Sequence, residues 1–367
     1  LNTKPQQLKK ELEDFLEDKI TRLERKGDEE SKLKLKQIKE DFAIVNSMEF
    51  VGSITDLRRV KVPTEKIIIT GSDASRDYLE LLWQCGLVPI FLKLVITSCA
   101  GVISRFENGI DEPPKYEYKE EPKFPIASGE MFIEEFSTRY PNLDESERSV
   151  LALISMNTTH FNFDSNLIRE IKPLIHFHDG RLLPPHMSYL DFYHRHRRDA
   201  LWHCFNQALN LKTTSELMVC QLVGVVKESH PDTAIVSKIV NMLLEKHGKC
   251  EYGKVPLDEF EVLNFILGDE NASWIIITRP INSYLINEED KAKKILGERD
   301  FERYKRHLEQ SDYCFFYLKH REHGLARYDF YLPSNKNNLE KQKAEIAYYA
   351  NKLAMPIIGE QFRLHRY

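Results

Sequence analysis

Two apolar segments that lie far apart in the sequence constrain the fold of this chain most. Residues 66–73 read Lys-Ile-Ile-Ile-Thr-Gly-Ser-Asp, and residues 172–179 read Lys-Pro-Leu-Ile-His-Phe-His-Asp. Each is a run of β-branched or apolar residues, typical of a buried strand, and small residues that allow a sharp turn follow the aspartate. We therefore predict two strands whose ends present Asp73 and Asp179. For either residue alone, an Asp that starts a turn by bonding its own backbone is the simpler explanation.

Helical and strand-like segments alternate along the rest of the chain. Helices are predicted over residues 77–84, 142–153, 189–209, 233–246 and 338–353, and strands over residues 217–227, 273–278, 313–318 and 326–332. Residues 107–127 are rich in proline and charge, and we predict an exposed loop or insertion there. Helices interleaved with buried strands indicate an α/β fold with a mixed sheet flanked by helices.

Residues 1–50 are predicted to form a helical arm that precedes a main domain over residues 51–367. Apolar residues recur every three or four positions between many Lys and Glu residues, first before and then after the pair Gly27-Asp28. The interruption indicates two helices. Such a pair either packs on the domain as a plain hairpin or serves as an arm for oligomerisation or partner docking.

Composition narrows the class of protein. Of 367 residues, 42% are hydrophobic and 30% charged, as in a globular protein. No apolar run reaches the roughly 18–20 residues of a membrane-spanning helix, and no secretory signal is visible at the N-terminus. The six cysteines form no C-x-x-C pair, which indicates reduced thiols in a cytoplasmic protein and argues against a zinc site. Because the net charge is −5, any nucleic-acid surface must be a local basic patch.

The two aspartates point to metal chemistry. Hard divalent cations bind carboxylate oxygens, and two-metal phosphodiester cleavage requires several carboxylates from separate elements. We expect a third ligand on the helix before the second strand, where Glu147 is the first choice, ahead of Glu145 and Glu135. All three glutamates could instead face solvent on an amphipathic helix.

Other polar residues near these segments have narrower expected roles. His176 and His178 would lie on one face of the strand, and Asp179, which directly follows His178, would lie on the opposite face. The two histidines would therefore take at most a supporting role at a metal site. Lys227 closes an apolar strand, where it could reach a scissile phosphate or extend to water. Short basic stretches could neutralise DNA phosphates, and the candidate residues are Arg195, Arg197, Arg198, Arg363 and His365.

Several of these segments resemble the NurA nucleases, which act with the HerA hexameric ATPase in DNA end processing. Residues 71–75 (Gly-Ser-Asp-Ala-Ser) are similar to the family's Gly-x-Asp-Gly-Ser, and residues 179–182 (Asp-Gly-Arg-Leu) are similar to its Asp-Gly-Ser-Leu. The family's Gly-Val-Val-Lys and Phe-Tyr-Leu-Lys segments are found at residues 224–227 and 316–319. The order and rough spacing of these motifs agree with the family over about residues 60–365.

The resemblance implies a ribonuclease-H-like fold, a homodimer, manganese or magnesium as the metal, and DNA as the substrate. It assigns the family glutamate to Glu147, and an alignment shifted by three would put Thr70 in place of Asp73. The sequence departs from the family's C-terminal Tyr-Pro…Ala-His element, where it has Met355 and Arg363, with His365 two positions further on.

Two functional hypotheses follow. The first is a divalent-metal-dependent deoxyribonuclease in which Asp73, Glu147 and Asp179 bind Mn²⁺ or Mg²⁺ and Lys227 assists. The second is a catalytically weakened module that docks on a HerA-type ATPase and positions DNA, a hypothesis motivated by the altered C-terminal element and the charged arm.

Overall fold

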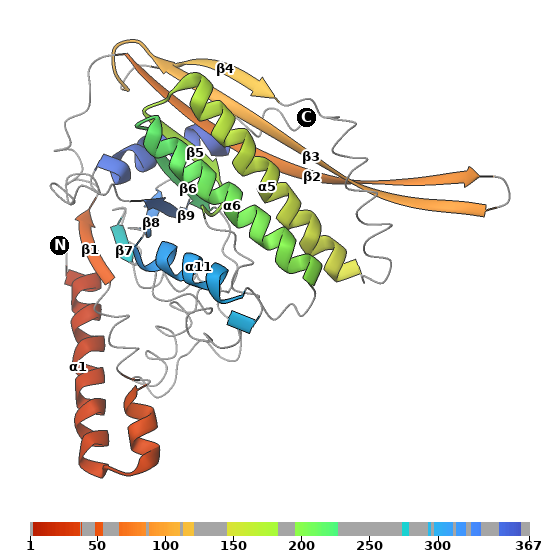
Figure 1. Cartoon of the computed structure of the whole chain (residues 1–367). Helices are drawn as coiled ribbons and strands as arrows, with labels where there is room; N and C mark the ends of the chain where they lie inside the picture. Colours follow the sequence, from red (N-terminus) through yellow and green to blue (C-terminus); the bar gives the residue numbers. More distant parts are fainter. Residues whose placement is uncertain are drawn as a thin grey trace. The chain divides into compact units, whose positions relative to one another are not determined.

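The computed structural model describes the chain in separate segments (Figure 1). The described residues are 3–36, 38, 48–53, 66–85, 88–110, 113–120, 145–182, 195–226, 274–278, 293–294, 297–310, 313–320, 324–331 and 345–360. The chain forms two compact units, and both are discontinuous in sequence. One contains residues 1–60, 226–282 and 312–351, and the other contains residues 61–225, 283–311 and 352–367.

Five strands of the second unit lie within the described residues, in a mixed arrangement. They are β2 (Ile67–Cys85), β3 (Val88–Phe106), β4 (Lys115–Glu120), β5 (Ile175–Asp179) and β6 (Gln221–Val226). Their order is β4-β3-β2-β5-β6, in which β2, β3 and β4 pair antiparallel and β5 is parallel to both β2 and β6. Three antiparallel strands followed by two parallel strands in this order form a ribonuclease-H-like sheet. The predicted α/β class is therefore confirmed.

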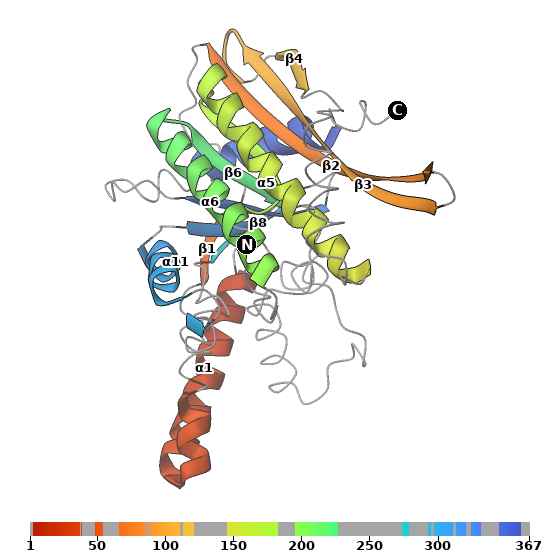
Figure 2. The same ribbon diagram turned by 45° about the vertical axis from the view of Figure 1, so that its right-hand side comes forward.

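Two long helices connect the parallel strands. Helix α5 (Glu145–Ile171) leads into β5, and α6 (Arg195–Leu217) leads into β6, as parallel pairing requires a crossover. The two helices lie side by side along one face of the strands in both views (Figures 1 and 2). Phe163 and Leu167 of α5 pack against Cys99 and Ile103 of β3 in a buried apolar cluster. This packing fixes the distance between the helix and the sheet, because a Cβ on Gly101 would come within 3.0 Å of Leu167.

The described residues of the first unit include the N-terminal helices and four strands. Helix α1 (Thr3–Lys26) precedes β1 (Met48–Ser53), which pairs antiparallel with β7 (Trp274–Thr278). Strands β8 (Tyr313–His320) and β9 (Gly324–Tyr331) form the hairpin that the sequence predicts, and β8 also pairs with β7. The described part of the chain also contains α11 (Glu298–Gln310), which belongs to the second unit, and the π-helix η3 (Ala350–Glu360), which continues the helical residues 345–349.

The predicted break between the two N-terminal helices is confirmed. Gly27 follows α1 with a left-handed φ of 67°, which glycine adopts without a steric penalty, and residues 29–36 form the next helix. Asp28 caps that helix, because its Oδ1 accepts a hydrogen bond of 2.7 Å from the backbone N–H of Ser31. Leu12 and Leu16 of α1 are buried, in agreement with the predicted apolar stripe. The role of the arm stays a prediction.

The first of the two opening segments differs from its prediction. Residues 77–84 are strand and not helix, because β2 runs from Ile67 to Cys85 and pairs with β3 along its whole length. Asp73 therefore lies inside a long strand and not at its end. Residues 115–120, placed in the predicted loop, form β4 on the edge of β3. In both cases antiparallel pairing with the neighbouring strand β3 overrides the local pattern, which favoured a helix or a loop.

Within the described residues, no helix is long and apolar enough to cross a membrane. Cys99, Cys204 and Cys220 are buried free cysteines, in agreement with the predicted buried thiols. The predicted helix over residues 233–246 lies outside the described residues.

Candidate metal centre

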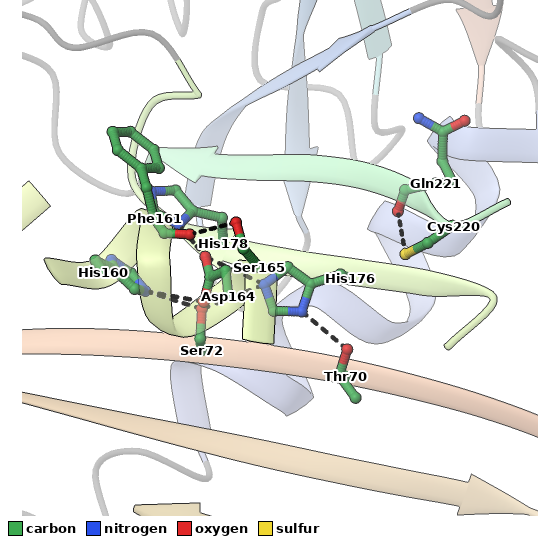
Figure 3. Close-up of polar contacts among 10 residues, drawn as sticks. All are labelled: Thr70, Ser72, His160, Phe161, Asp164, Ser165, His176, His178, Cys220 and Gln221. Carbon is green, nitrogen blue, oxygen red and sulfur yellow. Dashed lines mark hydrogen bonds and ion pairs between the residues drawn. The ribbon is translucent and has the colours of Figure 1, made fainter. Parts of the chain in front are cut away.

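A cluster of buried polar side chains lies where α5 packs on β2 and β5 (Figure 3). It consists of two residues from each element, and each of the six exposes 1% or less of its surface. The members are Thr70 and Ser72 of β2, His160 and Asp164 of α5, and His176 and His178 of β5. We call these six residues the polar cluster.

Local geometry explains why the three pairs meet. Residues four positions apart share one face of a helix, which aligns His160 with Asp164. Residues two positions apart share one face of a strand, so the members from β2 and β5 all face α5. The parallel register pairs Thr70 with His176 and Ser72 with His178, and the two strand pairs therefore lie side by side beneath the helix.

Asp164 is the centre of the hydrogen bonding. Nδ1 of His178 donates to its Oδ2 over 2.6 Å, a short distance typical of charge-assisted hydrogen bonds, and Nε2 of His176 lies 3.2 Å from the same oxygen. Thr70 Oγ1 is 2.8 Å from Nδ1 of His176, so a hydroxyl donor there fixes the ring with its Nε2–H toward Asp164. Ser72 Oγ is 2.8 Å from Nε2 of His160.

The rings are also held by packing. His160 and His178 are in contact, with ring centroids 4.0 Å apart and ring planes inclined by 31°. Phe161 stacks on His178 with centroids 4.9 Å apart. These contacts leave the imidazoles little rotational freedom, so the donor atoms of the polar cluster are held in place by the fold.

Burial and neighbouring charges set the protonation states. Burial lowers the pKa of His160 to about 3, and the adjacent His178 acts in the same direction, so the ring of His160 is neutral at neutral pH. Burial opposes ionisation of Asp164, but the histidines around it outweigh that effect and hold the pKa of its carboxyl well below the ordinary value. Asp164 is therefore an ionised carboxylate at neutral pH, and His176 and His178 donate hydrogen bonds to it.

One oxygen of this buried carboxylate has no hydrogen bond within the described part of the chain. Oδ1 of Asp164 is fully buried and lies 3.7 Å from Nε2 of His160, beyond hydrogen-bond distance. A buried polar atom without a partner costs about 1–3 kcal/mol. His160, Asp164 and His178 each offer one ligand atom, and these atoms all lie within 4.8 Å of one another. The residues therefore fit a divalent cation, which would satisfy the carboxylate oxygen.

The predicted aspartates lie beside the polar cluster. The parallel register ends with Ser72 opposite His178, so Asp73 and Asp179 follow it by one position on adjacent strands. Strand alternation puts both on the face opposite their cluster neighbours. Both are partly buried, and the charge of Asp73 raises the pKa of His160 against the larger effect of burial. Asp73 is thus within electrostatic reach of the cluster.

The chain after Asp179 turns sharply. Gly180 has φ of 133°, a value that favours glycine, and its N–H donates to the carbonyl of Val225 over 2.9 Å. A Cβ on Gly224 of β6 would lie 2.6 Å from the carbonyl oxygen of Gly180. The left-handed backbone therefore favours glycine at position 180, and the close approach of this turn to β6 requires a second glycine at position 224.

The other predicted site residues are not described at the level of side chains. Glu147 lies on the first turn of α5, but its side chain is outside the described residues. It precedes Asp164 by 17 positions, a rise of about 25 Å along the helix. The side chains of Arg195, Arg197 and Arg198, at the start of α6, are also outside the described residues. Lys227, Arg363 and His365 lie outside the described residues altogether.

Sequence reasoning missed His160 and Asp164. The available signal was the spacing of four between them in the segment His-Phe-Asn-Phe-Asp, which puts two ligand types on one helix face. The alternation of residues along a strand did correctly predict that His176 and His178 share a face, and both contact Asp164.

The fold and the polar cluster together define an α/β protein with a ribonuclease-H-like sheet and a candidate divalent-metal site. A crystal structure of the NurA nuclease from Sulfolobus solfataricus is distantly similar, with a TM-score of 0.35 and 9% sequence identity over 85% of this chain and 86% of that chain. No protein-family model and no curated protein matches the sequence. A similarity this remote does not place the chain in the NurA family.

Proposed function

We propose that this protein is a divalent-metal-dependent nuclease that hydrolyses phosphodiester bonds in DNA. The observation that carries the proposal is the adjacency of Asp73 and Asp179, which come one position after the paired residues Ser72 and His178 on parallel strands. Carboxylates from separate strands are what a metal-dependent phosphodiesterase requires. The ribonuclease-H-like strand order provides a known kind of scaffold for such a site.

In this proposal different residues bind the metal and the DNA phosphates. Asp73 and Asp179 supply carboxylate oxygens for Mn²⁺ or Mg²⁺, and Glu147 is the third ligand proposed from the sequence. When bound, such a cation lowers the pKa of an attacking water and stabilises the leaving oxygen. Lys227 and the basic residues Arg195, Arg197, Arg198, Arg363 and His365 would neutralise phosphate charge and hold the strand in position.

The finer parts of the proposal rest on the sequence motifs that resemble the NurA family. On that basis we propose a homodimer in the cytoplasm that works with a HerA-type hexameric ATPase in DNA end processing or in defence. The helical arm is the proposed site of self-association or of docking on the ATPase.

Replacing Asp179 tests the proposal. Asp179→Asn keeps the shape of the side chain and removes its charge, so metal-stimulated cleavage of labelled single- and double-stranded DNA should fall by at least about 100-fold. Glu216→Gln, an exposed acid at the end of α6, is the matched control and should cleave as the unchanged protein does.

Two results would contradict the nuclease assignment. Undiminished cleavage by a folded Asp179→Asn variant would show that the carboxylate is not required. Absence of cleavage by the unchanged protein with Mn²⁺ or Mg²⁺, together with retention of DNA in a gel-shift assay, would favour the module that positions DNA.

A further inference from the structure

We infer that His160, Asp164 and His178 form a binding site for a divalent transition metal of the Zn²⁺ type, distinct from the carboxylates Asp73 and Asp179. The inference depends on the polar cluster alone and does not require the proposed nuclease activity. Three observations carry it, namely the distances between donor atoms, the buried carboxylate oxygen without a hydrogen bond, and the supporting contacts.

The distances suit one cation. Atoms bound to the same Zn²⁺ at about 2.0–2.2 Å can be separated by no more than about 4.4 Å. Oδ1 of Asp164 and Nε2 of His160 are 3.7 Å apart, which is within that limit and too long for a hydrogen bond. The three ligand atoms together fall within 4.8 Å, only slightly more than this limit.

The donor types select the class of metal. Two imidazoles and one carboxylate suit Zn²⁺, Co²⁺ or Fe²⁺, whereas Mg²⁺ and Ca²⁺ prefer sites made only of oxygen. The carboxylates Asp73 and Asp179 provide oxygen alone, and strand alternation puts them on the other face of β2 and β5. The two sites therefore differ in the metal that each prefers.

The surroundings resemble those of a built metal site. Ligands in such sites are held by a second set of hydrogen bonds that fixes ring orientation. Here Nε2 of His176 contacts Oδ2 of Asp164 at 3.2 Å, and Thr70 holds His176 in turn. Ser72 Oγ lies 2.8 Å from Nε2 of His160 and hydrogen-bonds to that nitrogen in the metal-free site. In the metal-bound site, the same oxygen is available as a fourth ligand.

The alternative is a hydrogen-bonded network that needs no metal. The 2.6 Å hydrogen bond from His178 to Asp164 belongs to that state, and coordination by His178 would replace or rearrange it. The network leaves Oδ1 of Asp164 without a hydrogen bond among the described residues, whereas a cation supplies the missing interaction. The experiment below separates the two states.

The test is direct titration of the full chain, first stripped with a chelator, with Zn²⁺ and with Co²⁺. We expect about one equivalent of Zn²⁺ to bind, and Co²⁺ to give visible absorption bands typical of mixed nitrogen and oxygen ligands. Asp164→Asn and His160→Gln should each weaken Zn²⁺ binding by more than roughly 100-fold, because loss of a supporting contact alone costs 10–100-fold. His203→Gln, an exposed histidine on α6, is the matched control and should bind normally.

The outcomes distinguish this inference from the proposed nuclease. A folded, stripped protein that binds no Zn²⁺ or Co²⁺ overturns the inference, even if it cleaves DNA with Mn²⁺. Normal Zn²⁺ binding by His160→Gln also overturns it, and this variant decides the matter if Asp164→Asn does not fold. Normal Zn²⁺ binding by Asp179→Asn, in a protein that no longer cleaves DNA, supports two separate sites.

Discussion

Asp164 is the residue whose position most needs explanation. Moving an ionised carboxylate into a protein interior costs several kcal/mol unless charges and hydrogen bonds compensate. Here two imidazole N–H groups reach the same oxygen, at 2.6 and 3.2 Å, while the other oxygen has no hydrogen bond within the described residues. An arrangement that needed only stability would be served better by apolar side chains of similar volume. The partial satisfaction of this carboxylate therefore favours a functional role.

The residues of the polar cluster show what a sequence can and cannot reveal. The alternation of His176 and His178 with Asp179 predicts their common face from local geometry alone. Their partner Asp164 is 12 and 14 positions away, on another element, and its spacing of four from His160 does not show that it meets these two histidines. The contact depends on the register of β2 with β5 and on how α5 packs above them, which are properties of the tertiary structure.

The buried thiol of Cys204 gives a prediction at the same scale. Burial raises its pKa to about 12 from an ordinary value of 9.0, so very little thiolate is present at pH 8 in the folded protein. Because unfolding restores the ordinary pKa, Cys204 should stabilise the fold fully below about pH 9 and lose that contribution as the pH rises toward 12.

Thiol labelling at pH 8, followed by peptide mass spectrometry, checks this prediction. Cys204 should remain unmodified in the folded protein and react within minutes in urea, because the thiolate is the reactive species. The peptide containing Cys204 in the urea sample serves as the internal control. Rapid modification without urea would show that this part of α6 opens readily or that the thiol is accessible.

At the scale of elements, the long β2/β3 hairpin is the largest departure from the sequence prediction. Asp73 was expected at a strand end because a glycine and small residues surround it, yet β2 continues to Cys85. Strand β5, by contrast, does end at its predicted aspartate, Asp179, and the following Gly180 has a left-handed φ. The local turn signal is therefore sound for Asp179. At Asp73, antiparallel pairing with β3 through 19 residues overrides it.

The close approach of β6 to the turn after Asp179 predicts unequal effects for two glycine substitutions. Gly224→Ala would push its Cβ against the carbonyl oxygen of Gly180, a backbone atom only 2.6 Å away. We expect the free energy of unfolding to fall by about 1–3 kcal/mol, the usual cost of overpacking. The displaced turn should also weaken any activity that depends on Asp179.

Gly101→Ala is the matched control for this prediction. Its Cβ would meet Leu167 at 3.0 Å and Phe163 at 3.2 Å, both at side-chain ends that can move. The lower entropy of the unfolded chain, about 0.4–1 kcal/mol, offsets part of that crowding, so its net effect should be smaller. Equilibrium denaturation in urea measures both variants, and equal stability of Gly224→Ala and the unchanged protein would disprove the predicted contact.

At the scale of the whole molecule, the candidate metal-binding residues and the helical arm belong to different units. The polar cluster and the predicted aspartates belong to the unit that contains residues 61–225, whereas the helical arm belongs to the other. The division into an arm and a main domain that the sequence suggests is simpler than this arrangement, because segments from distant parts of the chain combine in each unit. Local patterns cannot predict such combinations, since they depend on pairing between remote strands.

This division predicts that metal binding does not require the arm. Deletion of residues 1–47, which precede β1, should leave Zn²⁺ affinity unchanged within about two-fold, because the arm and the polar cluster belong to different units and the effects of independent sites add to within roughly 0.3–0.5 kcal/mol. Leu33 is 73% exposed on the second helix of the arm, which suits a contact with another chain. If the arm mediates self-association, both the deletion and Leu33→Asp should lower the mass measured by light scattering. If a deletion variant that is folded by circular dichroism binds Zn²⁺ more than ten-fold more weakly, metal binding does require the arm. If the mass is unchanged in both variants, self-association belongs to another surface.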